Sequence, residues 1–345
     1  MNPSLCILIG SHISNPRRIA YLEECLVSLA RQTLPIPVYI SISFQTEELA
    51  KETIDQLKLN SEIVAANRIH IQIRSQKTPQ MRHIETLVNE LSGQYDWFMF
   101  CDDDDTYEPG RAAYFSAYIT KALGEIEEIN NTTNPGTNPC TYPCTYPDTH
   151  LSQKRTLAGA YESSFGKDHR EHRHEYWCYC VHVAVLREFY AKLSKYPDIV
   201  EDKCCDVLFA EHLRRSYPTK LFARITEKLY NYRVDNNSDS ITGVIQTNQP
   251  KYTNLERKVP PREQAGEWAE YVVYWNDYLY ENIDVYIHDT YLRTLVGCDL
   301  DYILRAEFMG NYDLIPFVDE CHVEKIRDYH IRLRGICNEI YDTAI

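Results

Sequence analysis

The sequence predicts an α/β fold, with a Rossmann-like and mostly parallel central sheet flanked by helices and a helical C-terminal appendage. Two observations predict it. Up to residue 105, short apolar runs of strand length alternate with amphipathic patterns of helical period. After about residue 246, the strand-like runs give way to aromatic-rich segments of helical character. Strands that alternate with helices pair in parallel through right-handed crossovers, which sets the expected strand direction.

The first strand and helix are the clearest pair. Residues 5–9 form an apolar run of buried-strand length that ends at Gly10. Asn15 and Pro16 then supply a cap and a first-turn proline, which together predict a helix start. Apolar residues at helical spacing follow over residues 19–29.

The same alternation predicts further elements up to a run of four aspartates. The expected strands are residues 38–43, 69–73 and 97–101, and the expected helices are residues 47–57 and 79–91. The last strand runs directly into aspartates 102–105, which we call the acidic cluster. Ligands of parallel sheets bind beyond the carboxyl ends of the strands, so the acidic cluster lies where a ligand is expected.

The rest of the chain is less regular. Prolines and a repeated Cys-Thr-Tyr-Pro predict a surface loop over residues 130–150. Strand-like alternation, a helix and late helical segments are expected at residues 175–186, 206–215, 268–280 and 329–341. We predict two domains, 1–245 and 246–345. The second would dock an acceptor, form a homodimer through its helices or cover the sheet edge.

The composition excludes several classes of protein. Among 345 residues, 44% are hydrophobic and the net charge is -14, which argues against binding to duplex nucleic acid or an anionic membrane. No run approaches the roughly 18 apolar residues of a transmembrane segment. The 12 cysteines are scattered and no export signal is visible, so we expect reduced thiols and a cytoplasmic location. An acidic protein can still bind a nucleotide diphosphate through a divalent cation.

The acidic cluster has the composition of a cation site. Asp102 and Asp104 project to the same side of an extended backbone. Their oxygens are hard ligands suited to Mg²⁺ or Mn²⁺, which can bridge two phosphates and absorb the charge on a departing nucleotide diphosphate. The alternative is a solvated acidic loop. An apolar strand leading into such a loop is unusual, because packed carboxylates repel one another.

Residues 97–111, Trp-Phe-Met-Phe-Cys-Asp-Asp-Asp-Asp-Thr-Tyr-Glu-Pro-Gly-Arg, resemble the family-2-type signature of GT-A glycosyltransferases. The opening segment through Gln32 and Thr33 is also similar to that family, and the resemblance extends over residues 4–245. It implies a GT-A fold and metal-dependent, inverting transfer of a hexosyl or pentosyl group from a nucleotide-sugar donor to a glycan or other hydroxyl acceptor. The resemblance implies that Asp104 binds the metal directly, together with Asp102. It also implies that Asp102 or Asp103 faces the ribose.

The resemblance also suggests contacts for the rest of the donor. The family often ends its second strand in an aspartate that recognises the base, whereas this chain has Ser43 and Gln45 there. A UDP-sugar is therefore expected by resemblance only, with Ser11, Ser43 and Gln45 as candidate base contacts. A family helix start falls at residues 79–85, which puts Arg82 near the nucleotide. Arg233 opens a segment similar to the family's closing loop, with an ordinary surface loop as the alternative.

An inverting transfer needs a carboxylate to take the proton of the acceptor hydroxyl. Residues 204–213 resemble the family's helix start that carries this base, with Asp206 in the aspartate position and Asp202 as the next candidate. The alternative for Asp206 is helix capping, since the helix dipole stabilises an anion there.

Aromatic and metal-ligand residues lie before that helix. Tyr176 and Trp177 are candidates to stack against an acceptor sugar, and the alternative is a place in the core. Histidines and cysteines of the types that bind zinc also occur, but their spacing matches no closed zinc pattern. They are His169, His172, His174, Cys178 and Cys180.

Two other functions compete. Asp102, Asp104 and Thr106 also match the first motif of haloacid-dehalogenase-like phosphatases, with Asp102 as nucleophile and Asp104 as general acid. That motif normally follows the first strand and has glycine where Asp105 stands here. The non-enzymatic alternative is a nucleotide-sugar-binding module that has lost turnover.

Overall fold

The computed structural model describes residues 3–132, 156–163, 175–202, 204–233, 266, 269–270, 290–307 and 320–341. The chain divides into two compact units, Met1–Arg233 and Val234–Ile345. The predicted domain boundary after residue 245 lies outside the described residues, and so do the three histidines of the zinc hypothesis. Most of the predicted loop 130–150 and nearly all of the predicted helical segment 268–280 also lie outside them. Of the segment predicted to close over the donor, only Arg233 is described.

The first unit is built on a seven-stranded sheet, in the order β3-β2-β1-β4-β7-β6-β8. Neighbours from β3 to β4 are parallel, β7 is antiparallel to both of its neighbours, and β6 and β8 are parallel. The predicted α/β fold, with a mostly parallel sheet flanked by helices, is confirmed. The strands are β1 (Leu5–Ile13), β2 (Val38–Phe44), β3 (Ile69–Ile73), β4 (Trp97–Phe100), β6 (Gly159–Glu162), β7 (Tyr179–His182) and β8 (Phe222–Ile225).

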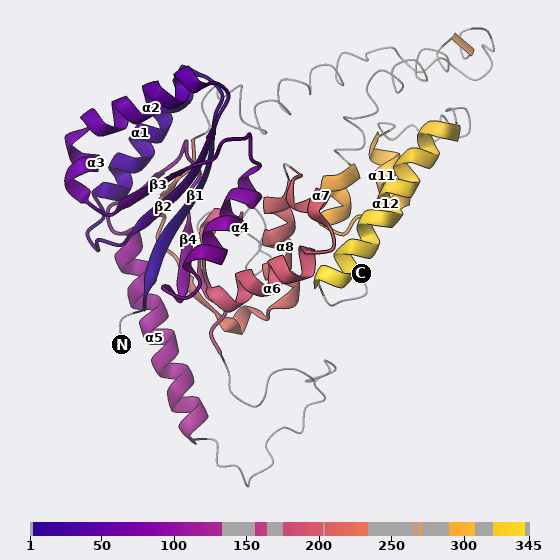
Figure 1. Cartoon of the computed structure of the whole chain (residues 1–345). Helices are drawn as coiled ribbons and strands as arrows, with labels where there is room; N and C mark the ends of the chain where they lie inside the picture. The colour runs from indigo at the N-terminus through magenta and orange to yellow at the C-terminus, as the bar shows by residue number, and fades with distance from the viewer. Residues whose placement is uncertain are drawn as a thin grey trace. The chain divides into compact units, whose positions relative to one another are not determined.

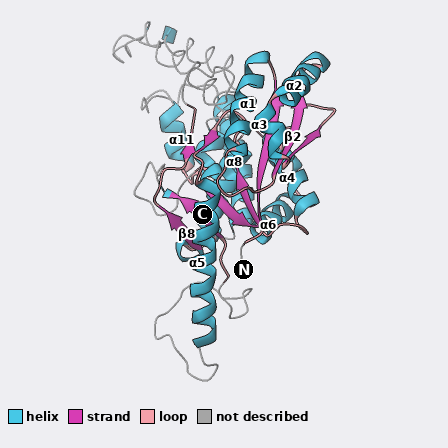
Figure 2. Cartoon of the chain, turned by 90° about the vertical axis from the view of Figure 1, so that its left-hand side faces the viewer, coloured by secondary structure: helices cyan, strands magenta, loops and turns pink. Residues whose placement is uncertain are grey.

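Helices cover both faces of this sheet. Helices α1, α2 and α3 lie on one face, and α4, α6 and α8 lie on the other (Figure 1). Figure 2 shows the strands between these helices from a second direction. The helices of the first unit are α1 (Pro16–Ala30), α2 (Glu47–Leu59), α3 (Ser61–Ala66), α4 (Gln80–Leu91), α5 (Arg111–Thr132), α6 (Val183–Leu193), α7 (Pro197–Val200) and α8 (Cys205–Ser216). The second unit contains α11 (Leu300–Glu307) and α12 (Glu320–Tyr341), as the predicted helical appendage requires.

The core follows from the apolar runs. All four residues of β4 are buried, and β1 is buried from Leu5 to Gly10. Gly10 is needed where β1 meets α4, because a Cβ there would lie 2.8 Å from the Gln80 carbonyl oxygen and 3.0 Å from the Cβ of His83. The glycine therefore lets α4 pack close to β1 at the edge where the site lies.

The strand predicted over residues 175–186 is shorter than expected. A 3-10 turn occupies Tyr176–Cys178, β7 spans Tyr179–His182, and α6 begins at Val183. The His182 side chain accepts a hydrogen bond from the Ala184 N–H and so caps α6. Short alternation does not distinguish a strand from the first turn of a helix, and the apolar spacing after Val183 is helical.

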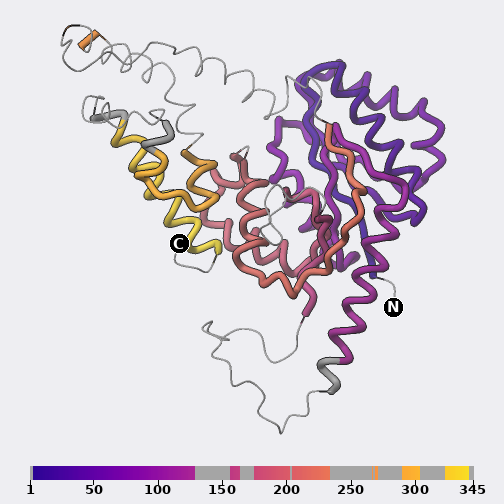
Figure 3. The backbone as a smooth tube through the Cα atoms, turned by 180° about the vertical axis from the view of Figure 1, so that it is seen from behind, coloured from indigo at the N-terminus to yellow at the C-terminus, as the bar shows by residue number. Residues whose placement is uncertain are grey.

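A small second sheet lies beside the acidic cluster. Strand β5 (Thr106–Tyr107) pairs antiparallel with β9 (Tyr230–Asn231). Figure 3 shows from behind the segment that carries β8 and then β9. This pairing brings residues 230–233 next to residues 102–107, although the two segments are far apart in the sequence.

Within the described residues, no helix has both the length and the apolar character needed to cross a membrane. The cysteines whose side chains the structure describes are free thiols, and nearly all are buried in the core.

Candidate functional site

The acidic cluster lies at the carboxyl end of β4, beside the parallel strand β1. Asp103 and Asp105 are buried, with exposed fractions of 5% and 1%, whereas Asp102 and Asp104 are half-buried. The Ser11 hydroxyl on β1 donates to Asp103 Oδ2 at 2.5 Å. Asp102 and Asp104 are thus the two members more accessible to a ligand.

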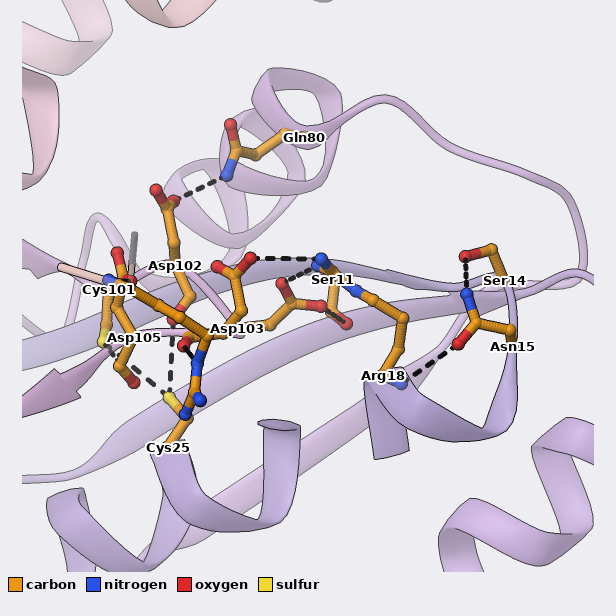
Figure 4. A network of polar contacts seen from close by, with 12 residues as sticks. Ser11, Ser14, Asn15, Arg18, Cys25, Gln80, Cys101, Asp102, Asp103 and Asp105 are labelled. Carbon is orange, nitrogen blue, oxygen red and sulfur yellow. Dashed lines mark hydrogen bonds and ion pairs between the residues drawn. The ribbon is translucent and has the colours of Figure 1, made fainter. Parts of the chain in front are cut away.

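Arg18 enters the acidic cluster from the first turn of α1. One amino group of its guanidinium donates to Asp103 Oδ1, and the other donates to Asp104 Oδ2 at 3.1 Å. Figure 4 shows Arg18 close to Asp103 and Ser11, with Gln80 directed at Asp102 from the opposite side. A guanidinium fork that bridges two carboxylates is a strong, directional contact.

Asp102 is held by three neighbours. Gln80 Nε2 donates to Asp102 Oδ1 at 2.7 Å, and the Tyr176 hydroxyl donates to the same oxygen. The backbone N–H of Asp102 donates to the Tyr230 hydroxyl at 3.1 Å. The carboxylate is therefore oriented, while its second oxygen makes none of these contacts.

Burial is the main reason that Asp102, Asp103 and Asp105 have raised pKa values. It raises the pKa of Asp102 well above its ordinary value, and the charges of Asp105 and Asp104 raise it further. Burial also raises the pKa of Asp105 to about 7. Carboxylates that raise one another's pKa gain from a nearby cation.

The residues of the acidic cluster fit a divalent cation that is shared with a ligand. Their oxygens are hard donors, and the excess negative charge favours such an ion. Among the described residues, no group of three or more His, Cys, Asp or Glu side chains is placed to hold a metal ion. A cation at Asp102 and Asp104 would therefore take further ligands from a bound molecule, such as the phosphate oxygens of a diphosphate.

Asp206 lies in the first turn of α8. Burial raises the pKa of Asp206 to about 7, with a further contribution from the charge of Glu175, although backbone N–H groups act in the opposite direction. The charge of Asp206 in turn raises the pKa values of Asp102 and Tyr176. The structure therefore brings Asp206 and Asp102 into one site.

Asp202 has a local role at the start of α8. Its carboxylate accepts the Cys204 N–H at 2.8 Å, and its carbonyl accepts the Cys205 N–H at 3.1 Å. These contacts order the turn that leads into the helix carrying Asp206.

Arg233 closes the acidic cluster from the side of β9. Its N–H donates to Asp105 Oδ1 at 2.7 Å, and its Nε donates to the Asp104 carbonyl at 2.7 Å. Its guanidinium also pairs with Glu24 and lies 4.3 Å from the centre of the Tyr21 ring. The structure thus places this sequence candidate at the loop, bound to its backbone and to Asp105.

A buried ion pair supports β9. Arg111 Nε lies 3.3 Å from Glu162 Oε2, and neither side chain is exposed. Glu162 Oε1 accepts the N–H groups of Leu229 and Tyr230 at 2.6 and 3.2 Å. The Tyr230 hydroxyl then donates to Asp105 Oδ2 at 2.7 Å. Glu162 therefore fixes the tyrosine that orders the acidic cluster.

Tyr176 and Trp177 lie in the core, with exposed fractions of 2% and 5%. Trp177 stacks on Tyr230 with ring centres 4.2 Å apart, and on Tyr232 at 5.5 Å. Tyr232 is the exposed member of this stack, at 38%. Acceptor stacking by Tyr176 and Trp177 stays a prediction, and Tyr232 offers the accessible ring.

The candidate base contacts gather around His12 at the ends of β1 and β2. Ser43 Oγ lies 3.0 Å from His12 Nδ1 and 3.2 Å from His83 Nε2. Gln45 Oε1 is 3.4 Å from His12 Nε2. His83 is fully buried, and its other ring nitrogen lies 2.8 Å from Ser41 Oγ. Burial lowers the pKa of His83 to about 4, helped by the charge of Arg74.

Arg82 has partners of its own. Its guanidinium contacts Glu85 at 2.5 Å, Glu201 at 3.4 Å and the Pro197 carbonyl at 3.1 Å. Its predicted place near the nucleotide stays a prediction.

Sequence reasoning missed Arg18, Gln80, Tyr230 and the supporting pair of Arg111 with Glu162. The position of Arg18 in the sequence was a usable signal, because it follows a helix cap directly after the first strand. Tyr230 had none, since its place depends on the pairing of β5 with β9 across 123 residues.

No protein-family model and no curated protein matches this sequence. Among solved structures, the chain is similar to S. aureus TarS 1-349 in complex with UDP, with 12% identity, a TM-score of 0.41, and coverage of 98% of this chain and 91% of that one. The same fragment with UDP-GlcNAc gives 11% identity, a TM-score of 0.37 and the same coverages. A longer S. aureus TarS structure gives 11% identity and a TM-score of 0.37, with 96% of this chain and 54% of that one covered.

We expect Glu162→Ala to destabilise the first unit by about 3–5 kcal/mol, because it leaves the Arg111 charge buried without its partner. Urea denaturation measures the change in the free energy of unfolding. The matched control is Glu62→Ala, which breaks the exposed Arg31–Glu62 pair and should change little. An equal, small effect of both variants would contradict a supporting role for the buried pair.

We expect stability to fall on acidification in a way that depends on His83. Its pKa is about 4 in the folded protein and ordinarily 6.5, so the unfolded chain takes up the proton first as the pH drops below 6.5. The stability present above pH 6.5 is then lost toward pH 4, by up to about 3 kcal/mol. Urea denaturation at pH 7 and 4.5 should show a smaller loss for His83→Gln than for the wild type. His70→Gln, on the exposed side of β3, should keep the wild-type loss, and identical losses in all three proteins would refute the prediction.

Proposed function

We propose that the chain is a glycosyltransferase of the GT-A type that moves a sugar from a UDP-sugar to a hydroxyl acceptor. The supporting observation is the meeting of carboxylates from two elements at one sheet edge. Asp102 and Asp104 follow β4, and Asp206 lies in the first turn of α8 with a pKa of about 7. Such an arrangement would combine a diphosphate site with a base, which the transfer requires.

The donor side is the edge formed by β1, β2 and β4. Asp102 and Asp104 would hold Mn²⁺ or Mg²⁺, and such an ion stabilises the charge that develops on a departing nucleotide diphosphate. Asp103 is buried behind Arg18 and Ser11, so Asp102 is the better placed to face the ribose. Ser11, Ser43 and Gln45 would bind the uracil side.

Asp206 would serve as the general base on the acceptor side. In this mechanism the acceptor oxygen forms a bond to the anomeric carbon while the bond from that carbon to the UDP oxygen breaks. The proton of the acceptor hydroxyl goes to the Asp206 carboxylate. A base with a pKa near the working pH combines availability with driving force for proton transfer.

The phosphatase alternative makes a different demand on Asp102. As a nucleophile, Asp102 would have to use Oδ2, because Tyr176 and Gln80 both donate to its Oδ1. The two functions separate by assay.

We expect UDP with Mn²⁺ to stabilise the wild type against heat, by about 2.7 kcal/mol at a hundred times the dissociation constant. Asp104→Asn should lose the Mn²⁺-dependent part, because it removes a ligand charge. Asp55→Asn, on the exposed face of α2, is the control and should respond as the wild type does. If no nucleoside diphosphate shifts the unfolding temperature and simple phosphate monoesters are hydrolysed, the phosphatase is the correct function.

We expect Asp206→Asn to lower UDP release from a cleavable UDP-sugar by about 10²–10⁴-fold while UDP binding persists. In the wild type, kcat/KM should rise with pH through about 7 and then level off, since Asp206 acts as a carboxylate. Asp202→Asn should keep most activity, because its contacts are to the turn before α8. A loss confined to Asp202→Asn would transfer the role of base to that residue, and full activity of both variants would refute a base at either.

A further inference from the structure

Arg18 places a cation inside the acidic cluster. Its guanidinium pairs with Asp103 and with Asp104. The three side chains are only 13%, 6% and 16% exposed, so these contacts are largely shielded from water. Charge pairs are stronger in such surroundings. The free protein therefore carries its own positive charge where the proposed function requires a divalent cation.

The two contacts of Arg18 are not equivalent. Asp103 is also bound by the Ser11 hydroxyl and is the more deeply buried partner, which makes it an anchor for the guanidinium. Asp104 is more exposed and accepts the longer contact of 3.1 Å. Asp104 is also the aspartate that the proposed function assigns to the metal. A guanidinium and a divalent cation repel each other, so they compete for this carboxylate.

A diphosphate is the ligand that would draw the guanidinium from Asp104. The planar fork of arginine matches phosphate oxygens as well as carboxylates. The N-terminus of α1 cannot provide this contact easily, because the Asn15 side chain already accepts the N–H groups of Arg17 and Arg18 at 3.0 and 3.4 Å. The Arg18 side chain is thus the anion-binding group that α1 presents at this edge.

We propose that Arg18 is an internal counter-ion that holds Asp104 in the free protein and moves to the diphosphate of the donor. Asp103 keeps one arm of the guanidinium, while Asp104 becomes free for the divalent cation. The cation and the nucleotide then bind cooperatively, because each removes an obstacle to the other. This inference rests on the proposed function and makes Arg18 a positioning residue for the donor.

The test is a titration with Mn²⁺ in the presence and absence of UDP. Electron paramagnetic resonance measures the concentration of free Mn²⁺ and so gives its affinity for the protein. In the wild type, UDP should tighten Mn²⁺ binding about tenfold or more, and Mn²⁺ should tighten UDP binding by the same factor. Arg18→Gln should bind Mn²⁺ alone about tenfold more tightly than the wild type, with a smaller further effect of UDP.

Two more variants define the role of the guanidinium. Arg18→Lys keeps the charge but not the fork, and should bind Mn²⁺ with an affinity between those of the wild type and Arg18→Gln. Arg17→Gln is the matched control, since Arg17 lies in the same turn over the Tyr21 ring at 5.3 Å, and should behave as the wild type. Circular dichroism checks folding, and Arg18→Lys decides the test if Arg18→Gln does not fold.

The outcomes separate this inference from the function on which it rests. If neither Arg18 variant binds Mn²⁺ more tightly than the wild type, while UDP still tightens Mn²⁺ binding in the wild type, the counter-ion role is overturned and the proposed function stands. If the wild type binds no nucleoside diphosphate with or without Mn²⁺, the proposed function fails and the counter-ion role fails with it.

Discussion

The buried ion pair of Arg111 and Glu162 is the interaction on which the rest of the site depends. Arg111 begins α5, directly after the acidic cluster and β5, and Glu162 ends β6. The rings of Tyr107 and Tyr230 lie 4.2 and 4.6 Å from the guanidinium carbon and partly replace the lost water. Because Glu162 also accepts the Tyr230 N–H, the pair fixes the tyrosine whose hydroxyl binds Asp105 and the Asp102 N–H. Two charges in the core thus set the geometry of the acidic cluster.

The four aspartates of the acidic cluster divide into an inner and an outer pair. Asp103 and Asp105 are buried and have partners from other elements, Arg18 for the first and the Arg233 N–H for the second. Asp102 and Asp104 are the more exposed pair, and they are the two that the sequence spacing places on one side. The contacts of the inner pair tie the loop to α1 and β9, and the outer pair is the more accessible to a ligand. Repulsion among carboxylates, a cost in the isolated loop, would favour a bound cation in the proposed function.

The sequence predicted the layers of the fold better than the contacts of the site. The β1–α1 unit, the strand before the acidic cluster and the helix carrying Asp206 were predictable, since each depends on local periodicity and capping. The start of α6 at Val183 was not, because the alternation before it fits strand and helix equally. The partners of the acidic cluster were also beyond the sequence. Tyr230 and Glu162 reach it only through strand pairing. The pairing of Arg82 with Glu85 and Glu201 was also not predicted.

The charge state of Asp206 is connected to that of Asp102. The charge of Asp206 raises the pKa of Asp102, and electrostatic repulsion is mutual, so the same interaction favours the protonated form of Asp206. Any positive charge that settles beside Asp102 therefore lowers the pKa of Asp206 and increases the fraction of carboxylate that can accept a proton. A site without a donor would hold a base that is partly protonated near pH 7, whereas a loaded site would hold an ionised one. In the proposed function, this electrostatic interaction would make the protonation state of Asp206 depend on the occupancy of the donor side, which would limit proton abstraction from water before a donor is present.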